Sequence, residues 1–225
     1  MKIVCTHFKG GVGKSTTAIH VVGALMAFNR HVLLIDGDRQ TTSYEFFNEG
    51  QKPQSYEPLQ IDEQLSITPL YEAKPVNGVH LGERLNKLKK HCQDCLVVDT
   101  TPDSHLVNQM IDEINPDVII IPVKHDDLGG HKQLTGLLHN IGVLAAIGIT
   151  PKVIILPIGG DRSSIEPYLP SNTDLLLEFA QTIPFNSELV GKAVFEESQF
   201  IWEYQAGEIY YSLYTKLIEE AENGS

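Results

Sequence analysis

The chain has 225 residues, of which 42% are hydrophobic and 20% are charged, and its 17 basic and 29 acidic residues give a formal net charge of −12. This composition is typical of a soluble globular protein rather than a disordered one, and the acidic balance argues against a broad basic surface for nucleic acid. No apolar run approaches the roughly 18 residues that a membrane-spanning helix needs. The first residues show no signal-peptide pattern, so we expect a cytoplasmic protein.

Short apolar runs alternate with helix-like stretches along the chain. In chain order, the first half predicts a strand at 2–8, a helix at 15–29, a strand at 31–35, a helix at 41–48, a loop at 50–58, a strand at 64–70, a helix at 81–91 and a strand at 95–98. The second half predicts a strand at 118–121 ending at Pro122, a helix at 126–144, a strand at 152–156 ending at Pro157, a helix at 174–181, a strand at 182–183, and helices at 188–196 and 205–220.

Strands that alternate with helices, and that carry nearly continuous β-branched runs, indicate a mostly parallel sheet covered on both faces. We therefore expect a doubly wound α/β fold, with helices flanking both faces of the sheet and right-handed crossovers. No linker or repeat divides the chain, so residues 1–225 are predicted to form a single domain.

The three cysteines fit a reducing compartment. Cys92 and Cys95 form a C-x-x-C pattern, which could mark a redox pair or half of a metal site. Because Cys95 opens an apolar run and no second pair exists, we favour a structural role for both.

The clearest functional motif lies between the first predicted strand and the first predicted helix. A phosphate-binding loop (P-loop) needs this context, because its glycines let successive backbone N–H groups point inward at an anion beside the helix N-terminus. Lys14 is then expected to reach the β- and γ-phosphates of ATP, and the Ser15 hydroxyl to bind Mg²⁺. The predicted nucleotide-binding residues are Lys9, Gly10, Gly11, Val12, Gly13, Lys14, Ser15 and Thr16.

Two acidic motifs follow later strands, at residues 35–40 and 96–102. Carboxylates at the ends of parallel strands are well placed for a ligand, because ligands in open α/β sheets lie beyond the carboxyl ends of the strands. Each motif alone could equally be a polar turn. Together with the P-loop they form three motifs at three strand ends, which is a much more specific pattern.

The extra lysine in Lys9-Gly10-Gly11 makes the P-loop resemble that of the ParA/MinD family of deviant-Walker ATPases. The resemblance implies that Lys9 crosses a dimer interface to the partner's phosphates, although it could instead contact its own nucleotide or solvent. It also implies catalytic roles for Lys9, Lys14 and Asp38, with Asp38 orienting the attacking water. Gln40 would contact the nucleotide.

The same resemblance assigns Mg²⁺ to Ser15, Asp36 and Asp99, with Asp99 acting through water. Two departures stand out: Arg39 replaces the usual proline of the D-x-D-P-Q motif, and Thr100 follows Asp99. In the second half of the chain the resemblance is looser. It rests on residues 121–123, 183–185 and 193–196, and it identifies no base-contacting residue.

The short length resembles the small ParA-type branch, whose members position plasmids or carboxysomes. The resemblance implies an ATP-dependent homodimer, nonspecific DNA binding on the nucleoid, a partner protein that stimulates hydrolysis, and no membrane binding. Arg162 and Lys192 are the candidate DNA contacts, and a solvated surface charge is the alternative for each. Other candidates are a MinD-like membrane switch, an ATP-dependent ligase of the same superfold, and an iron–sulfur carrier.

Overall fold

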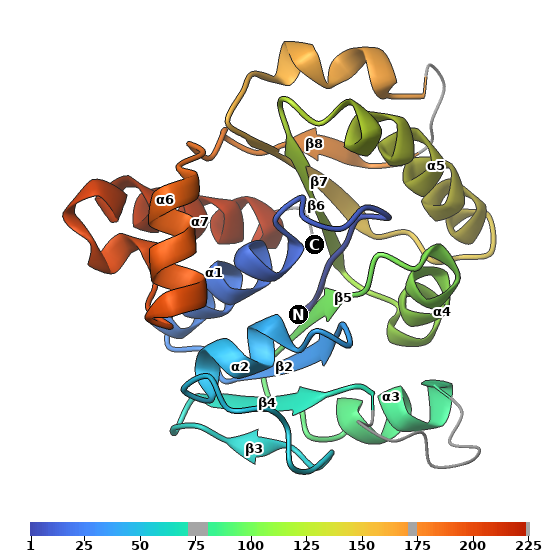
Figure 1. Cartoon of the computed structure of the whole chain (residues 1–225). Coiled ribbons are helices and arrows are strands. Elements are labelled where there is room, and N and C mark those ends of the chain that lie inside the picture. The colour runs from blue at the N-terminus through green and yellow to red at the C-terminus, as the bar shows by residue number, and fades with distance from the viewer. Residues whose placement is uncertain (72–80, 171–174, 224–225) are drawn as a thin grey trace.

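The computed structural model describes residues 1–71, 81–170 and 175–223. These residues contain an eight-stranded sheet with the order β3-β4-β2-β5-β1-β6-β7-β8 (Figure 1). Every neighbouring pair of strands is parallel except β3 and β4. The strands are β1 (Lys2–Cys5), β2 (Val32–Gly37), β3 (Leu59–Gln60), β4 (Leu65–Pro69), β5 (Cys95–Thr100), β6 (Val118–Lys124), β7 (Lys152–Ile158) and β8 (Leu177–Phe179).

Helices cover both faces of this sheet, so the predicted doubly wound α/β fold is confirmed (Figure 1). One face carries α1 (Lys14–Ala27), α2 (Thr42–Phe47), α6 (Ser187–Val190) and α7 (Glu208–Glu222). The other face carries α3 (Leu81–Lys89), α4 (Ser104–Ile114) and α5 (Leu128–Ala145). Short 3₁₀ turns lie at Arg162–Ser164, Glu166–Tyr168, Ile201–Glu203 and Gln205–Gly207, and a π-helical turn lies at Gly191–Glu196.

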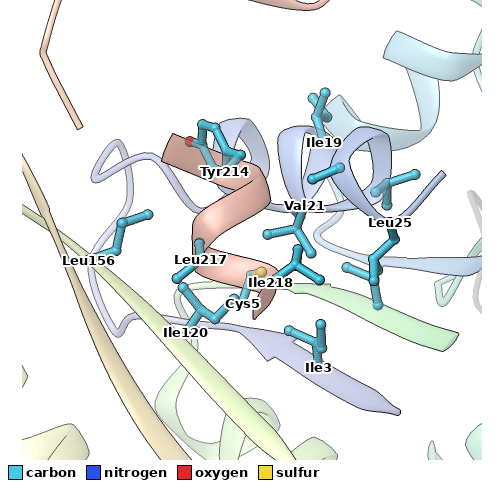
Figure 2. Packing of buried hydrophobic residues seen from close by; sticks show 14 of the residues in the cluster. Ile3, Cys5, Ile19, Val21, Leu25, Ile120, Leu156, Tyr214, Leu217 and Ile218 are labelled. Carbon is cyan, nitrogen blue, oxygen red and sulfur yellow. The ribbon is translucent and has the colours of Figure 1, made fainter. Parts of the chain in front are cut away.

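Strands β1, β2, β5, β6 and β7 each contribute to both layers of the core, because successive side chains point to opposite faces of a sheet. In β1, Ile3 and Cys5 face α1 and α7, whereas Val4 faces the layer of α3, α4 and α5. Figure 2 shows the core layer between the sheet and the helices α1 and α7. Its labelled residues are Ile3, Cys5, Ile120, Leu156, Ile19, Val21, Leu25, Tyr214, Leu217 and Ile218.

The apolar face of α7 is thus used for packing within the chain. Tyr210 and Tyr214 are both buried there, as expected if the aromatic residues of this helix pack on the sheet. Among the described residues, no helix is long and apolar enough to cross a membrane.

His20 joins α1 to the segment that precedes α7. Its Nδ1 donates to the Thr16 carbonyl oxygen at 2.6 Å, and its Nε2 accepts from the Ile201 N–H at 3.1 Å. Burial lowers the pKa of His20 to about 4, so the ring is neutral at pH 7. The rings of Phe200 and Trp202 stack at 4.7 Å beside it. The two hydrogen bonds of His20 hold the first turns of α1, which directly follow the P-loop, against the segment before α7.

Two glycine variants test this packing. A Cβ at Gly23 in α1 would lie 2.5 Å from Cε1 of Phe200 and 2.8 Å from Cζ2 of Trp202, whereas a Cβ at Gly136 in α5 would meet nothing within 4 Å. Gly23→Ala is therefore expected to destabilise the fold by about 1–3 kcal/mol through overpacking. Gly136→Ala should stabilise it by about 0.5–1 kcal/mol. Urea unfolding of both variants measures the difference, and equal effects would contradict the packing.

The predicted helix at 174–181 is wrong within its described residues. The segment instead contains β8, which extends the sheet beyond β7: the Val153 N–H donates to the Leu176 carbonyl oxygen at 2.8 Å, and the Ala180 N–H donates to the Ile155 carbonyl oxygen at 2.9 Å. Pairing with β7 overrides the local helix preference. The prediction's first residue, 174, lies outside the described residues.

The prolines that were expected to end β6 and β7 lie within those strands. In β6, the carbonyl oxygen of Ile120 accepts from the Thr6 N–H, so the backbone of Pro122, two residues on, faces the same side. Since β1 ends at Cys5, no strand on that side would accept a hydrogen bond from an N–H at position 122. Strand β6 continues to Lys124 through its pairing with β7. Helix α4 and the two-residue strand β3 were not predicted.

Candidate functional site

The P-loop lies where the sequence predicts it, between β1 and α1 (Figure 1). Gly11 and Gly13 have φ angles of 75° and 103°, a conformation that residues with a Cβ rarely adopt. The loop then enters α1, whose first residues are Lys14 and Ser15. The sequence needs glycine at these two positions because the chain must curl before the helix begins.

Lys14 folds back under the loop. Its side chain is 6% exposed, and Nζ donates to the carbonyl oxygen of Lys9 at 3.1 Å. Burial lowers the pKa of Lys14, while the charges of Asp99 and Asp38 act in the opposite direction. An ammonium that makes one hydrogen bond to the described residues has two further N–H donors, which an anion at the loop can accept.

Asp36 and Asp99 lie directly opposite each other on β2 and β5. Both point toward the α1 side, since they share the strand face of Leu34 and Val97. Asp36 is 1% exposed and accepts from the Ser43 hydroxyl and the Tyr44 N–H, each at 2.8 Å. Asp36 therefore also holds the first turn of α2 in place.

Asp99 has no such bonds. It is fully buried, and neither carboxylate oxygen has a hydrogen-bond partner among the described residues. Burial, and secondly the Asp36 charge, raise the pKa of Asp99 to about 8. The hydroxyl of Ser15 lies near enough to lower this pKa somewhat without forming a hydrogen bond of ordinary geometry.

These residues fit a nucleotide with Mg²⁺. An orphaned buried carboxylate beside a second buried carboxylate suits a divalent cation, which removes the repulsion between them. Burial also raises the pKa of Asp36, to about 6, so a proton can take the cation's place in the free protein. Of the predicted metal ligands, Asp36, Asp99 and Ser15 are thus brought together. Their binding of Mg²⁺ stays a prediction.

Asp38 and Gln40 share a tight turn after β2. The Asp38 N–H donates to Asp36 Oδ1 and the Gln40 N–H donates to Asp38 Oδ1, both at 3.0 Å. The Thr41 N–H closes the turn on the Asp38 carbonyl oxygen at 3.2 Å. The turn therefore forms with Arg39 at its tip, without the proline that the resemblance led us to expect.

Lys9 lies at the rim of the site. Its Nζ forms an ion pair with Asp127, which also accepts from the Gly130 N–H at the start of α5. The Lys9 side chain is 36% exposed. In this single chain Lys9 therefore contacts its own chain, and its reach to a second copy stays a prediction.

His7, which was not predicted as a site residue, supports the start of the P-loop. It is buried, and its Nδ1 accepts from the Lys9 N–H at 3.1 Å. Burial, and secondly the charge of Lys14, lower the pKa of His7 to about 4. A neutral ring therefore anchors the start of the P-loop.

A cavity of about 510 Å³ extends from the P-loop toward the C-terminal segment. Its phosphate end is lined by predicted site residues, among them Gly10, Gly11, Gly13, Lys14, Ser15, Thr16, Asp38 and Gln40. Its other end is apolar and was not predicted; it is lined by Ile158, Ile183, Pro184, Phe185, Val190, Phe195 and Tyr210. Lys124 Nζ lies 4.5 Å from the centre of the Phe185 ring there. The apolar end has the character expected of a nucleobase site.

The remaining candidate residues lie elsewhere. Arg162 pairs with Glu166 and lies over the Phe179 ring, and Lys192 lies 3.6 Å from Glu197. Cys92 is half-buried and Cys95 is buried, both as free thiols. No group of three or more His, Cys, Asp and Glu side chains in the described part of the chain is arranged to hold a metal by itself.

Comparison with known proteins gives a consistent result. The family model described as "CobQ/CobB/MinD/ParA nucleotide binding domain" matches residues 3–190. The chain therefore belongs to this family of nucleotide-binding P-loop proteins, within which the ParA/MinD resemblance is confirmed. A search of curated proteins found no match.

Several solved structures share the whole fold. Apo McdA of Cyanothece has a TM-score of 0.73 at 17% identity, with 98% of both chains covered. A plasmid partition protein of Borrelia burgdorferi B31 bound to AMPPNP has a TM-score of 0.66 at 19% identity, covering 97% of this chain and 98% of the other. MinD of Aquifex aeolicus has a TM-score of 0.64 at 18% identity, covering 97% and 96%. At these identities the likeness shows the fold.

Proposed function

We propose that this chain is a Mg²⁺-dependent ATPase of the ParA type, whose ATP-bound form is a homodimer. The observation that carries the proposal is Lys9, a half-exposed cation directly before the P-loop glycines, whose cavity is already lined by Lys14. A P-loop needs one lysine for its own phosphates. A second lysine beside the loop, partly exposed and paired with Asp127, is suited to the phosphates of a second copy.

The residues of the phosphate end take separate roles in this proposal. The P-loop amides and Lys14 bind the phosphates, and Asp38 orients the attacking water. When bound, Mg²⁺ would neutralise charge that develops on the phosphates. Lys9 adds a cation from the other copy, as an arginine finger does, an effect worth about 10³–10⁵ in rate. Hydrolysis by the isolated chain is therefore expected to be slow.

The ion pair of Lys9 with Asp127 does not prevent this role. Both side chains are partly exposed, and pairs of this kind are worth about 0.2–1 kcal/mol. Lys9 can leave Asp127 at little cost once a triphosphate on another copy is within reach.

Nonspecific DNA binding by the ATP dimer, a partner protein that stimulates hydrolysis, and a plasmid or protein-organelle cargo complete the proposal. Support comes from the similarity to McdA and to the plasmid partition protein. Such a protein would be cytoplasmic and associated with the nucleoid. The net charge of −12 requires any DNA-binding surface to be local.

The test uses Asp38→Ala, which should bind ATP without turning it over. Light scattering with MgATP, MgADP or no nucleotide should give a dimer mass with MgATP alone. Retention on random-sequence DNA should then require MgATP and fall steeply between about 50 and 200 mM salt. A monomer under every condition would contradict the ATP dimer. Flotation with liposomes instead of DNA retention would favour the membrane switch, and turnover that needs a small acid or amine would favour the ligase.

Lys9→Ala tests whether Lys9 acts in dimerisation and not in folding. We expect the variant to unfold like the wild type, because Lys9 is half-exposed. In the Asp38→Ala background, we expect it to raise the dissociation constant of the MgATP dimer at least tenfold. Lys132→Ala, which removes an exposed lysine of α5, is the control and should leave the dimer unchanged. Equal dimerisation by the Lys9 and Lys132 variants would show that Lys9 is misassigned.

A further inference from the structure

Arg39 lies at the tip of the turn between Asp38 and Gln40 and lines the same cavity as Lys14 and Ser15. The residue is exposed. The turn does not depend on its side chain, since its hydrogen bonds come from Asp36, Asp38 and the backbone of residues 38–41. The Arg39 side chain is therefore free to serve a ligand.

Arg39 lies beside an aromatic ring rather than a carboxylate within the described part of the chain. It forms no ion pair with any residue that the structure describes, and its guanidinium carbon lies 5.7 Å from the centre of the Tyr71 ring. The other three arginines all donate to oxygen. Arg30 and Arg162 donate to glutamates, and Arg84 donates to backbone carbonyl groups.

The Tyr71 ring lies beside the Arg39 guanidinium. The Tyr71 hydroxyl is buried without a hydrogen-bond partner among the described residues, so it does not draw Arg39 away. Its ring face attracts a cation weakly. A weak apolar contact of this kind can orient a guanidinium and still leave all five N–H donors available.

The charged side chains around the cavity divide by position. Lys14 lies beneath the P-loop, and Lys124 lies over Phe185 at the apolar end. Asp38 lies near Lys14, since its charge acts on the Lys14 pKa. Arg39, the next residue after Asp38, is an exposed cation that lines this cavity.

We infer that Arg39 contacts the terminal phosphate of a nucleotide bound in its own chain and thereby distinguishes a triphosphate from a diphosphate. The inference rests on the proposed function. A guanidinium suits this task because it can donate two parallel hydrogen bonds to phosphate oxygens, whereas an ammonium acts as a point charge.

Calorimetric titrations with AMPPNP and with ADP, both with Mg²⁺, test the inference on the wild type, Arg39→Ala, Arg39→Lys and Arg30→Ala. In Arg39→Ala the affinity for AMPPNP should fall about tenfold or more, since charged hydrogen bonds are lost, while the affinity for ADP stays within twofold. Arg39→Lys should recover part of the loss. Arg30→Ala, on an exposed ion pair with Glu222, should match the wild type.

The outcomes separate the two proposals. If the wild type binds neither nucleotide, the proposed function fails. If the wild type binds both and Arg39→Ala keeps the wild-type ratio of AMPPNP to ADP affinity, only the role of Arg39 fails. A loss that appears only at high protein concentration would place the contact on a second copy and overturn the same-chain assignment.

Discussion

Replacing Lys14 with alanine is expected to lower the affinity for MgATP and MgADP by about 100-fold or more while leaving the fold intact. Lys14 is 6% exposed, and within the described residues its ammonium has one hydrogen bond, to the Lys9 carbonyl oxygen. Its remaining donors are available to phosphate oxygens, and each hydrogen bond to a charged group is worth about 1.5–3 kcal/mol. Two such bonds exceed the roughly 2.7 kcal/mol that correspond to a 100-fold change.

The stability of the Lys14→Ala variant should change little. Burial disfavours the charged form of Lys14, as the lowered pKa shows, so removing the ammonium also removes its desolvation cost. Thermal unfolding without nucleotide measures this, and calorimetry measures the two affinities.

Lys124→Ala is the matched comparison, because it removes a lysine from the apolar end of the same cavity. It should weaken both nucleotides less than tenfold. If Lys124→Ala were the more damaging variant, the phosphates would lie at the other end of the cavity.

The phosphate end of the cavity could be predicted because its chemistry is local in sequence. A lysine and glycines between a strand and a helix define the P-loop, and Asp36 and Asp99 each follow a run of buried residues. Parallel pairing of β2 with β5 then brings the two aspartates together. Nothing beyond strand order was needed.

The apolar end could not be predicted in the same way. Ile158 ends β7, Phe185 lies in a loop and Phe195 lies in a π-helical turn, so these side chains meet only after the C-terminal segment folds back onto α1. Each is an ordinary apolar residue in its own stretch of sequence. Their shared function arises from tertiary packing.

The errors in the predicted secondary structure have local and non-local causes. Helix α4 had signals that could have been used: Asp103 caps it by accepting from the N–H groups of His105 and Leu106, and Val107 and Met110 start its buried face. By contrast, β8 forms because β7 offers an unpaired edge, and no pattern within 174–181 indicates that edge.

The second large effect concerns Asp99 in the absence of nucleotide and Mg²⁺. Between pH 6.5 and 8 the wild-type protein is expected to lose about 1 kcal/mol of its free energy of unfolding, and Asp99→Asn is expected to abolish this loss. The pKa of Asp99 is raised to about 8 in the folded protein by burial and by Asp36. Its unfolded value is about 3.9. The folded state therefore binds more protons over this interval, so stability falls as pH rises.

The pH interval begins at 6.5 because three other groups with shifted pKa values, His7, His20 and Asp36, change their protonation mainly below that pH. His7 and His20 have pKa values lowered to about 4, so the unfolded state holds their protons up to about pH 6.5 and stability rises with pH there. The pKa of Asp36 is raised to about 6, so its contribution also ends before the interval begins. Above pH 6.5 the two histidines still add about 0.4 kcal/mol each as their unfolded forms lose their remaining protons, but the loss from Asp99, about 1.7 kcal/mol up to pH 8, is larger.

Urea unfolding at several pH values, in buffer with a chelator, measures the effect on the wild type, Asp99→Asn and Asp126→Asn. Asparagine has nearly the same shape as aspartate and does not ionise, so the Asp99 variant should be the more stable protein at pH 8 and show no fall in stability above pH 6.5. Asp126 is exposed, and its variant should keep the wild-type slope. A wild-type stability that does not fall above pH 6.5, or a fall of the same size in Asp99→Asn, would mean that the Asp99 carboxylate is not held protonated. The case for a cation taking the place of that proton beside Asp36 would then fail.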